Sequence, residues 1–545
     1  MTPAAPPARR RAPAGRRGAA AGESMSWDVV PAALPDVTVV RGTVATSPLL
    51  TEDDVDALVL PVAPATDEDE GVQPRSGTTD AAVRLGVDLP DLADRARLTG
   101  AAGEAHVVHL PRPIAGSADL PWAGLPPRVV LVGIGDGTTT DLRRAGAAVA
   151  RVTRRLRRVV CTVGSDSGPS GTAALVEGYL LGAYRQPVRR KDAGEPAADE
   201  LVLLGRYAEA AVGTATRSAR ATWVARALSA TPSSVKDPQW VADQARLLAA
   251  ALGLDVEVLG VEELTRRGFG GVLAVGGGSA REPRLVVVRW TPEQPVSSGV
   301  PPRHVVVVGK GITYDTGGLS IKPREAMVPM KTDMTGAAVA LATVLGAAEA
   351  RVPHRVTAVL PLAENAVGAA SYRPGDVVTV FGGTTVEIAN TDAEGRVVLA
   401  DALAYADAEL DPDVLVDVAT LTGAATLGLG KQNAALYSPD DALARALADA
   451  GAAAGEPLWR MPLVEDYRTA IRSDVADVRH VPADSTTGGG SITAALFLQR
   501  FVGARRWAHL DIAGPARSSS ATHEVPEGAT GFGARALLRW LGELR

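Results

Sequence analysis

Three short stretches between residues 310 and 396 place charged side chains inside strongly apolar sequence. They read GKGITYDTGGLSIK at 309–322, MKTDMTGAA at 330–338 and NTDAEGRVVLADAL at 390–403. Their candidate chemical groups are Lys310, Asp315, Lys322, Asp333, Asp392, Glu394 and Arg396. Clustered carboxylates bind hard or borderline divalent cations, so these stretches are the first candidates for a site of chemistry.

The first two stretches hold their charges where a functional site would need them. Lys310 comes just after the four-valine strand 305–308, where a buried ammonium group is costly unless it is paired or deprotonated. Asp315 falls in a Gly/Thr-rich turn beyond that strand, and ligands of open α/β sheets collect at the carboxyl ends of strands. Asp333 opens a helix of small residues, so its carboxylate can face the helix N-terminus.

The third stretch pairs two acids with a cation. Asp392 and Glu394 are two residues apart, so in an extended segment they would project to the same side. Gly395 then allows an unusual backbone turn, and Arg396 adds a fixed positive charge.

Four converging carboxylates would repel one another and raise one another's pKa values, and a pair of divalent cations would relieve that repulsion. Zinc, manganese, magnesium and cobalt all suit such a site. The seven histidines show no H-E-x-x-H spacing, which argues against a histidine-based metalloprotease. From residue types alone, a network of internal salt bridges is an equally good interpretation.

The elements that must position these groups follow an α/β pattern, in which β-rich runs alternate with Ala-rich helical runs. Buried strands are expected at 57–62, 128–135, 284–290, 304–312, 414–421 and 507–514. Helices are expected over 141–158 and 335–350, and such crossovers predict a largely parallel sheet. The Gly-rich clusters at 133–138, 276–279 and 488–491 predict turns, because none completes a G-x-G-x-x-G phosphate loop.

Length and composition indicate more than one domain. At about 150 residues per domain, 545 residues allow two to four domains. The polar stretch 189–200 predicts a linker or exposed loop. We expect an Arg/Ala/Pro-rich disordered tail over 1–25, an N-terminal α/β domain over 26–205 and a larger C-terminal domain over 206–545.

The overall charge and the cysteine count narrow the class of protein. A net charge of -6 argues against a nucleic-acid binder. The single cysteine, Cys161, excludes an intrachain disulfide and a Cys-based zinc cluster, and it fits a reducing compartment. The sequence contains no uninterrupted apolar run of about 18 residues, so no membrane span is predicted.

The motif NTDAEGR at 390–396 resembles the signature of the leucyl aminopeptidase family, the cytosolic two-metal exopeptidases. GKGITYDTGGLSIK and KTDM resemble that family's other metal-binding stretches, in the same order, and the resemblance extends from about residue 220 to the C-terminus. It implies a smaller, macro-like N-terminal α/β domain and a larger catalytic α/β domain with a mixed, largely parallel central sheet. It also implies a cytoplasmic homohexamer that releases Leu and other apolar N-terminal residues from peptides.

The resemblance assigns five metal ligands for two divalent ions, manganese or zinc. Asp315 and Glu394 would bridge the two ions. Lys310, as a neutral amine, and Asp333 would complete the tighter site. Asp392 would complete the more exchangeable site.

The resemblance also implies roles for residues that do not bind metal. Lys322 and Arg396 would be the catalytic pair, with Lys322 polarising the scissile carbonyl and Arg396 holding a bicarbonate-like anion. Met330, Thr420 and Gly423 match positions that line the pocket for the first side chain of the substrate.

Two features leave the substrate range and further roles open. The chain has LSATPSSVKDP at 228–238 where the family often has an Asn-rich stretch, and Pro515 and Arg517 where a small residue and an aromatic are usual. Some family members also act on DNA as architectural regulators, and four arginines at helical spacing could form a basic stripe here: Arg144, Arg151, Arg155 and Arg158. The acidic net charge favours a solvated helix face instead.

Overall fold

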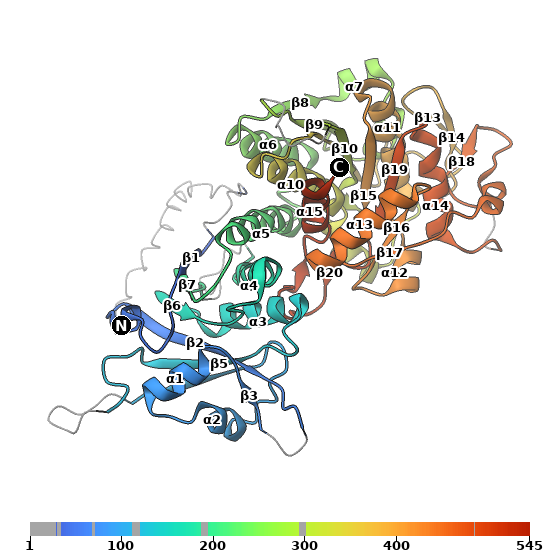
Figure 1. Cartoon of the computed structure of the whole chain (residues 1–545). Coiled ribbons are helices and arrows are strands. Elements are labelled where there is room, and N and C mark those ends of the chain that lie inside the picture. Colours follow the sequence, from blue (N-terminus) through green and yellow to red (C-terminus); the bar gives the residue numbers. More distant parts are fainter. Residues whose placement is uncertain are drawn as a thin grey trace, which may run out of the picture.

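The computed structural model describes residue 29 and residues 34–67, 71–111, 120–186, 195–293, 301–483 and 486–545. Two β-sheets, each with helices on both faces, form the two halves of the molecule (Figure 1). The expected tail over 1–25 and most of the expected linker over 189–200 lie outside the described residues. Within the described ranges, no helix is both long enough and apolar enough to cross a bilayer.

The first sheet has seven strands, and the four successive pairings from β1 to β5 are parallel. Its strand order is β1 (Asp36–Val40), β7 (Glu200–Leu204), β6 (Arg158–Cys161), β2 (Val55–Ala63), β5 (Arg128–Gly133) and β4 (Ala105–His109), with β3 (Gln73–Pro74) beside β2. Helices α3 (Thr139–Val152) and α4 (Gly168–Gly182) pack on one face, and α1 (Thr78–Leu85) and α2 (Leu89–Arg95) pack on the other.

The second sheet has nine strands and is mixed. Its order is β17 (Leu458–Arg460), β16 (Ala434–Tyr437), β19 (Arg506–Asp511), β15 (Val414–Ala419), β10 (His304–Gly309), β12 (Arg355–Asn365), β9 (Arg284–Trp290) and β8 (Asp255–Leu259), with β11 (Gly311–Asp315) beside β12. The central strands from β19 to β12 are parallel, and β9 pairs antiparallel with both β12 and β8. Strand β16 pairs antiparallel with β19 but parallel with β17. The predicted mixed, largely parallel sheet is confirmed.

The valine run of β10 shows why these strands are apolar throughout. Val305 and Val307 face helices α5 (Glu209–Ala230), α6 (Pro238–Ala250), α10 (Thr335–Glu349), α13 (Asp441–Ala454) and α15 (Ala534–Glu543). Val306 and Val308 face α7 (Val261–Arg267), α8 (Gly270–Gly276), α11 (Glu394–Tyr405) and α14 (Gly490–Leu498). Because helices cover both faces, a strand in this sheet needs apolar residues at every position.

The helix expected over 141–158 is too long. Helix α3 ends at Val152, Arg155 has a positive φ of 62°, and strand β6 begins at Arg158. The four arginines therefore do not form one helical stripe. Arg155 forms an ion pair with Glu195, and Arg158 forms ion pairs with three acids: Glu52, Asp54 and Glu200.

Two of the three predicted glycine turns are confirmed. Residues 133–138 connect β5 to α3, and a capping box formed by Thr138 and Asp141 starts the helix. In the cluster 276–279, Gly276 ends α8 and residues 277–279 form the turn that follows. In the third cluster, Gly490 begins helix α14.

Helix α5 joins the two halves through a buried arginine. Trp223 packs into the core of the first sheet, whereas Val224 and Leu228 pack into the core of the second. Between them, Arg226 is 1% exposed and donates three hydrogen bonds to backbone carbonyl oxygens, those of Leu181 at 3.1 Å, Glu524 at 3.0 Å and Thr530 at 2.8 Å. Burial, followed by the charge of Arg535, lowers the pKa of Arg226 to about 10, so the group stays charged at neutral pH.

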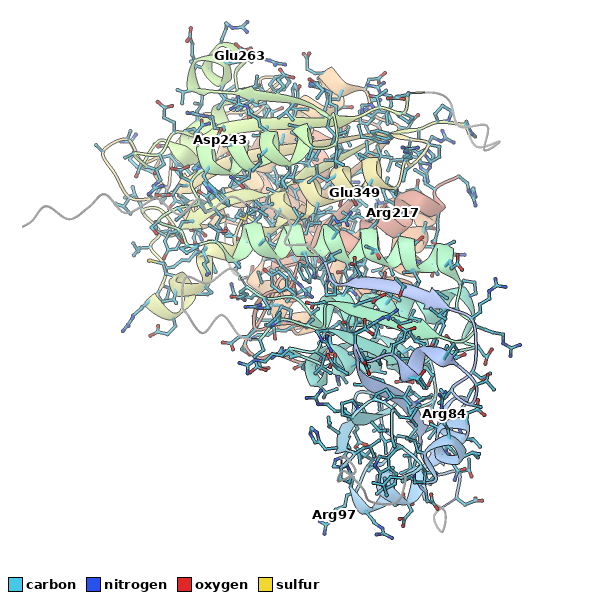
Figure 2. All side chains as sticks on the ribbon, turned by 90° about the vertical axis from the view of Figure 1, so that its left-hand side faces the viewer. Arg84, Arg97, Arg217, Asp243, Glu263 and Glu349 are labelled. Atoms are coloured by element: carbon cyan, nitrogen blue, oxygen red, sulfur yellow. The ribbon has the colours of Figure 1, made fainter. Side chains whose placement is uncertain are left out.

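Replacing this residue, Arg226→Met, is expected to reduce the free energy of unfolding by about 3 kcal/mol, because three buried carbonyl groups lose their donor. Thermal unfolding followed by circular dichroism measures the loss. The control is Arg217→Met on the same helix (Figure 2), where the side chain is partly exposed and donates a hydrogen bond to Thr214. Equal melting temperatures for the two variants would contradict the role of Arg226.

Candidate active site

The candidate residues lie where parallel strands of the second sheet end. Lys310 follows β10, Asp315 is the last residue of β11, and Thr420 follows β15. The backbone of Lys310 is fixed from both sides, because its N–H donates to Val418 O at 3.0 Å and its carbonyl accepts from Ala337 N at 2.8 Å. The carboxyl edge of this sheet therefore presents all three groups on one side of the domain.

A cavity of about 270 Å³ opens at this edge. Its wall includes all ten predicted site residues, namely Lys310, Asp315, Lys322, Met330, Asp333, Asp392, Glu394, Arg396, Thr420 and Gly423. Leu421, Ala513, Ala516 and Arg517 also line it. The structure thus brings together residues that are up to 113 positions apart in the sequence, from Lys310 to Gly423.

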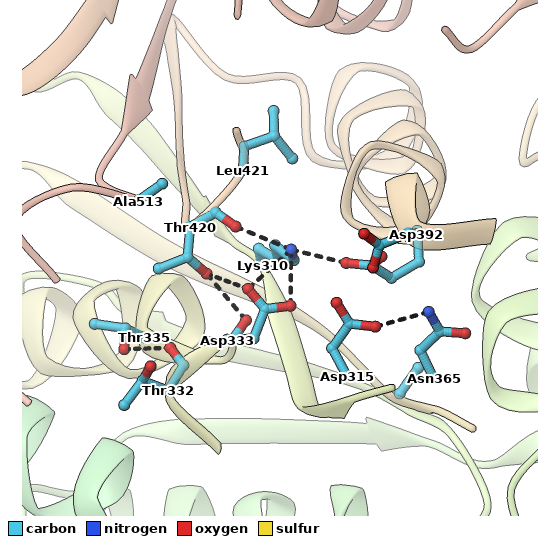
Figure 3. A network of polar contacts seen from close by, with 12 residues as sticks. Lys310, Asp315, Thr332, Asp333, Thr335, Asn365, Asp392, Thr420, Leu421 and Ala513 are labelled. Atoms are coloured by element: carbon cyan, nitrogen blue, oxygen red, sulfur yellow. Dashed lines mark hydrogen bonds and ion pairs between the residues drawn. The ribbon is translucent and has the colours of Figure 1, made fainter. Parts of the chain in front are cut away.

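Lys310 lies at the buried end of the cavity, between two acids (Figure 3). Its Nζ is 2.9 Å from Asp333 Oδ2 and 2.8 Å from Glu394 Oε1, and it donates to Thr420 O at 3.0 Å. Burial alone would lower the pKa of Lys310, but Asp333, Glu394 and Asp315 raise it above its usual value. With these neighbours alone, the side chain is an ammonium ion.

Lys322 forms a second, parallel arrangement. Its Nζ is 2.8 Å from Asp315 Oδ2 and also pairs with Asp392 Oδ1. Burial would lower the pKa of Lys322, but Asp315 and then Glu394 raise it above its usual value. Each lysine therefore lies between two carboxylates, as in the salt-bridge interpretation of the sequence.

The acids crowd one another despite these two cations. Burial and repulsion from Glu394 raise the pKa values of Asp315 and Asp333. Glu394 behaves oppositely, because Lys310 and Lys322 lower its pKa more than burial raises it. The pKa values of neighbouring carboxyls are thus pushed apart, which marks a site with excess negative charge.

One carboxylate oxygen of this cluster is left over. Among the described residues, the buried Glu394 Oε2 has no hydrogen-bond partner. Asp315, Asp392 and Glu394 each offer an oxygen, and these oxygens all lie within 4.8 Å of one another. A hard cation would satisfy the unpaired oxygen and relieve the crowding, so the donor set fits divalent metal ions.

Asp392 and Glu394 do not reach the site from an extended segment, so that prediction is wrong. Asp392 lies in the 3-10 helix η3 (Thr391–Ala393), and Glu394 is the first residue of α11. The Asn390 side chain accepts a hydrogen bond from Asp392 N at 2.9 Å and starts this helical turn. Both carboxylates lie at a helix N-terminus, which favours negative charge.

Gly395 is needed for space and not for an unusual turn, which corrects the second expectation for this stretch. It lies inside α11 with helical geometry. A Cβ atom at this position would meet Lys310 at 2.5 Å from Cε and 2.7 Å from Nζ. Only glycine lets the helix approach the lysine this closely.

Arg396 lies one residue further along the helix, and its guanidinium is nearly buried. It donates from Nη1 to His480 O at 2.7 Å, while its Nε has no partner among the described residues. Burial lowers the pKa of Arg396 to about 10, so the group is cationic at neutral pH. An unpaired N–H on a buried cation is a ready donor to a small anion.

Two further residues, Asn365 and Asp511, position the site and were not predicted. Asn365, the last residue of β12, donates from Nδ2 to Asp315 Oδ1 at 2.8 Å. Asp511, at the end of β19, accepts from Thr422 N at 3.0 Å and Leu421 N at 3.1 Å, and so holds the loop after β15. Asn365 falls in the segment that resembles the family, but its residue type alone carried no signal of this contact.

A model of the catalytic domain of the cytosol aminopeptidase family matches residues 223–538, which is more than half of the chain. The chain belongs to the cytosol aminopeptidase family. A second model, for the N-terminal domain of cytosol aminopeptidases, matches residues 79–192. The resemblance carried by the three motifs is therefore confirmed, and so is the two-part α/β architecture.

Curated relatives have the same family name. A probable cytosol aminopeptidase of Synechococcus sp. is 42% identical over 422 residues, which span 76% of this chain and 85% of that protein. A probable cytosol aminopeptidase of Leifsonia xyli is 44% identical over 441 residues, which span 77% of this chain and 86% of that protein.

Solved structures agree with the family. The bottromycin maturation enzyme BotP in complex with Mn is similar at a TM-score of 0.76 and 35% identity, over 90% of this chain and 99% of BotP. A mutant of tomato leucine aminopeptidase is similar at a TM-score of 0.79 and 28% identity, over 94% of this chain and 97% of that chain. The protein is an aminopeptidase, and thus a peptidase hydrolase.

Proposed function

We propose that this cytosol aminopeptidase uses two divalent metal ions to release Leu and other apolar residues from the N-termini of peptides. The observation that supports this most strongly is the buried cluster of four carboxylates and Lys310 around one cavity, with Glu394 Oε2 unpaired. Asp315 and Glu394 would be shared between the ions. Lys310 and Asp333 would complete one site and Asp392 the other.

When bound, the two ions supply a water molecule of lowered pKa at neutral pH and a ligand position for the free α-amine of the substrate. Lys322 carries a positive charge at the cavity wall and stabilises the oxygen of the scissile carbonyl as it becomes negative. Arg396 presents its unpaired Nε to a bicarbonate-like anion that can move a proton. None of the described residues that line the cavity is a histidine, so a bound anion suits this task.

The proposed preference for an apolar first residue is supported by the uncharged part of the cavity wall. Met330, Thr420, Gly423, Ala513 and Ala516 contribute no charge to it. The hydroxyl of Thr420 donates to Asp333 Oδ1 at 2.7 Å, so its hydrogen-bonding capacity is used within the site. A side chain such as Leu or Met would bury apolar area there, worth about 25 cal/mol per Å².

Removing the metal is expected to abolish activity. Purified protein loaded with manganese or zinc should hydrolyse Leu-p-nitroanilide, and a chelator should stop the reaction until metal is restored. The variant Asp392→Ala removes one proposed metal ligand and leaves the sheet intact. It should therefore stay inactive when metal is supplied. Metal-loaded protein that leaves N-terminal Leu, Met and Ala substrates untouched would contradict the proposal.

A further inference from the structure

Arg517 differs from the other cations of the catalytic cavity. Lys310 and Lys322 form ion pairs, and Arg396 donates to a backbone carbonyl. Arg517 lines the same cavity, and within the described part of the chain its side chain has neither a hydrogen bond nor an ion pair. Its guanidinium is partly exposed, so a solute in the cavity can reach it.

The backbone that carries Arg517 is held firmly. Arg517 begins strand β20 (Arg517–Ser518), which pairs with β21 (Gly528–Ala529). The preceding turn is closed by Ala516 N donating to Ile512 O at 2.9 Å, and Thr530 N donates to Ala516 O at 3.1 Å. The guanidinium of Arg517 therefore extends into the cavity from a backbone that is fixed, although the side chain itself has no partner among the described residues.

We propose that Arg517 binds a carboxylate of the peptide substrate, so that the enzyme prefers anionic peptides over neutral peptides with the same reacting bond. This inference rests on the proposed aminopeptidase function. A guanidinium presents a rigid fork of N–H donors that matches a carboxylate with two parallel hydrogen bonds.

The charge balance of the cavity supports an anionic ligand. The charge of two divalent cations would balance that of the four carboxylates, so the wall, with Arg517 among its cations, would carry more positive than negative charge. A cavity with this excess of positive charge attracts anions, so their concentration in it is higher than in bulk water. Lys322 and Arg396 face the reacting bond in the proposed mechanism, which leaves Arg517 for a carboxylate elsewhere on the peptide.

Three parts of a peptide could supply this carboxylate, and matched substrate pairs separate them. Leu-Gly against Leu-Gly-amide tests the C-terminal carboxylate of a dipeptide. Leu-Asp-amide against Leu-Asn-amide tests the side chain of the second residue, and Glu-p-nitroanilide against Gln-p-nitroanilide tests that of the first. In the metal-loaded wild type, the acid of one pair is expected to have a KM about tenfold lower than its neutral partner.

Variants at position 517 show whether this preference comes from the arginine. Arg517→Gln is expected to bring the acid-to-neutral ratio of KM close to one, and Arg517→Lys to restore part of it, because an ammonium keeps the charge but not the fork. Arg217→Gln, which removes an equal charge outside the cavity, should keep the wild-type ratio. Calorimetric binding of reduced-bond analogues of the pair that shows the preference, as acid and as neutral form, should give the same ratio without turnover.

The outcomes separate the two proposals. If the wild type hydrolyses Leu-p-nitroanilide but treats both members of every pair alike, the assignment of Arg517 is overturned and the aminopeptidase function stands. The same holds if Arg517→Gln keeps the wild-type ratio. If no peptide is hydrolysed at all, the proposed function itself fails.

Discussion

Replacing Lys322 with methionine is expected to lower kcat for Leu-p-nitroanilide by about 100- to 1,000-fold, the usual cost of losing a donor to a developing oxyanion. Lys322 lines the cavity, and Asp315 and Asp392 fix its ammonium group from two sides. Its raised pKa keeps the charge in place throughout the neutral range. Because the interaction strengthens only as negative charge develops, KM should change little.

The control for this prediction is Lys431→Met, which removes an exposed lysine outside the cavity wall and should leave kcat unchanged. The metal content of each variant, measured by elemental analysis, shows whether Asp315 and Asp392 still bind without their lysine partner. A variant that keeps its metal and its kcat but has a higher KM would place Lys322 in substrate binding instead of catalysis.

Gly395→Ala is expected to lower kcat/KM by about 100-fold, the scale on which a displacement of about 1 Å disturbs a catalytic site. The added methyl group would occupy the space of Lys310 Cε and Nζ, which lie 2.5 Å and 2.7 Å from it. The end of a lysine side chain can move aside, so the fold survives, but Nζ then leaves its position between Asp333 and Glu394. Alanine also favours a helix by about 1 kcal/mol over glycine, so stability should not fall with activity.

The matched control is Gly428→Ala in helix α12 (Gly423–Leu429), where an added Cβ meets no atom within 4 Å. Melting temperature, metal content and kcat/KM are measured for both variants. If the two variants are equally active, the close approach of α11 to Lys310 is not needed for catalysis.

The sheets could be predicted from the sequence because their strands are apolar on both faces. The predicted range 284–290 coincides with β9, and the run from Val305 to Val308 lies within β10. Helix α10 was equally clear, since its small residues pack on all sides. Signals of this kind are local, and burial on both faces enforces them at every position.

Features that depend on contacts between distant segments could not be predicted from local sequence patterns. The two-residue spacing of Asp392 and Glu394 fits a strand, yet the cap from Asn390 makes the segment helical. The role of Gly395 depends on Lys310, which is 85 positions earlier in the sequence. A run of arginines continued the pattern of α3 beyond Val152, although the chain turns at Arg155. The hexamer, the DNA-binding alternative and the identity of the metals stay predictions.

The buried contacts of Arg226 also determine how this protein can be recombined with its relatives. Its three acceptors belong to α4 of the first half and to the chain around residues 524–530 of the second. A chimera that exchanges only the N-terminal half would replace the end of α4 that carries the Leu181 carbonyl, while the acceptors at Glu524 and Thr530 stay unchanged. The transferable module is therefore discontinuous in sequence, since the N-terminal half must travel with helix α5 and the loop over 524–530.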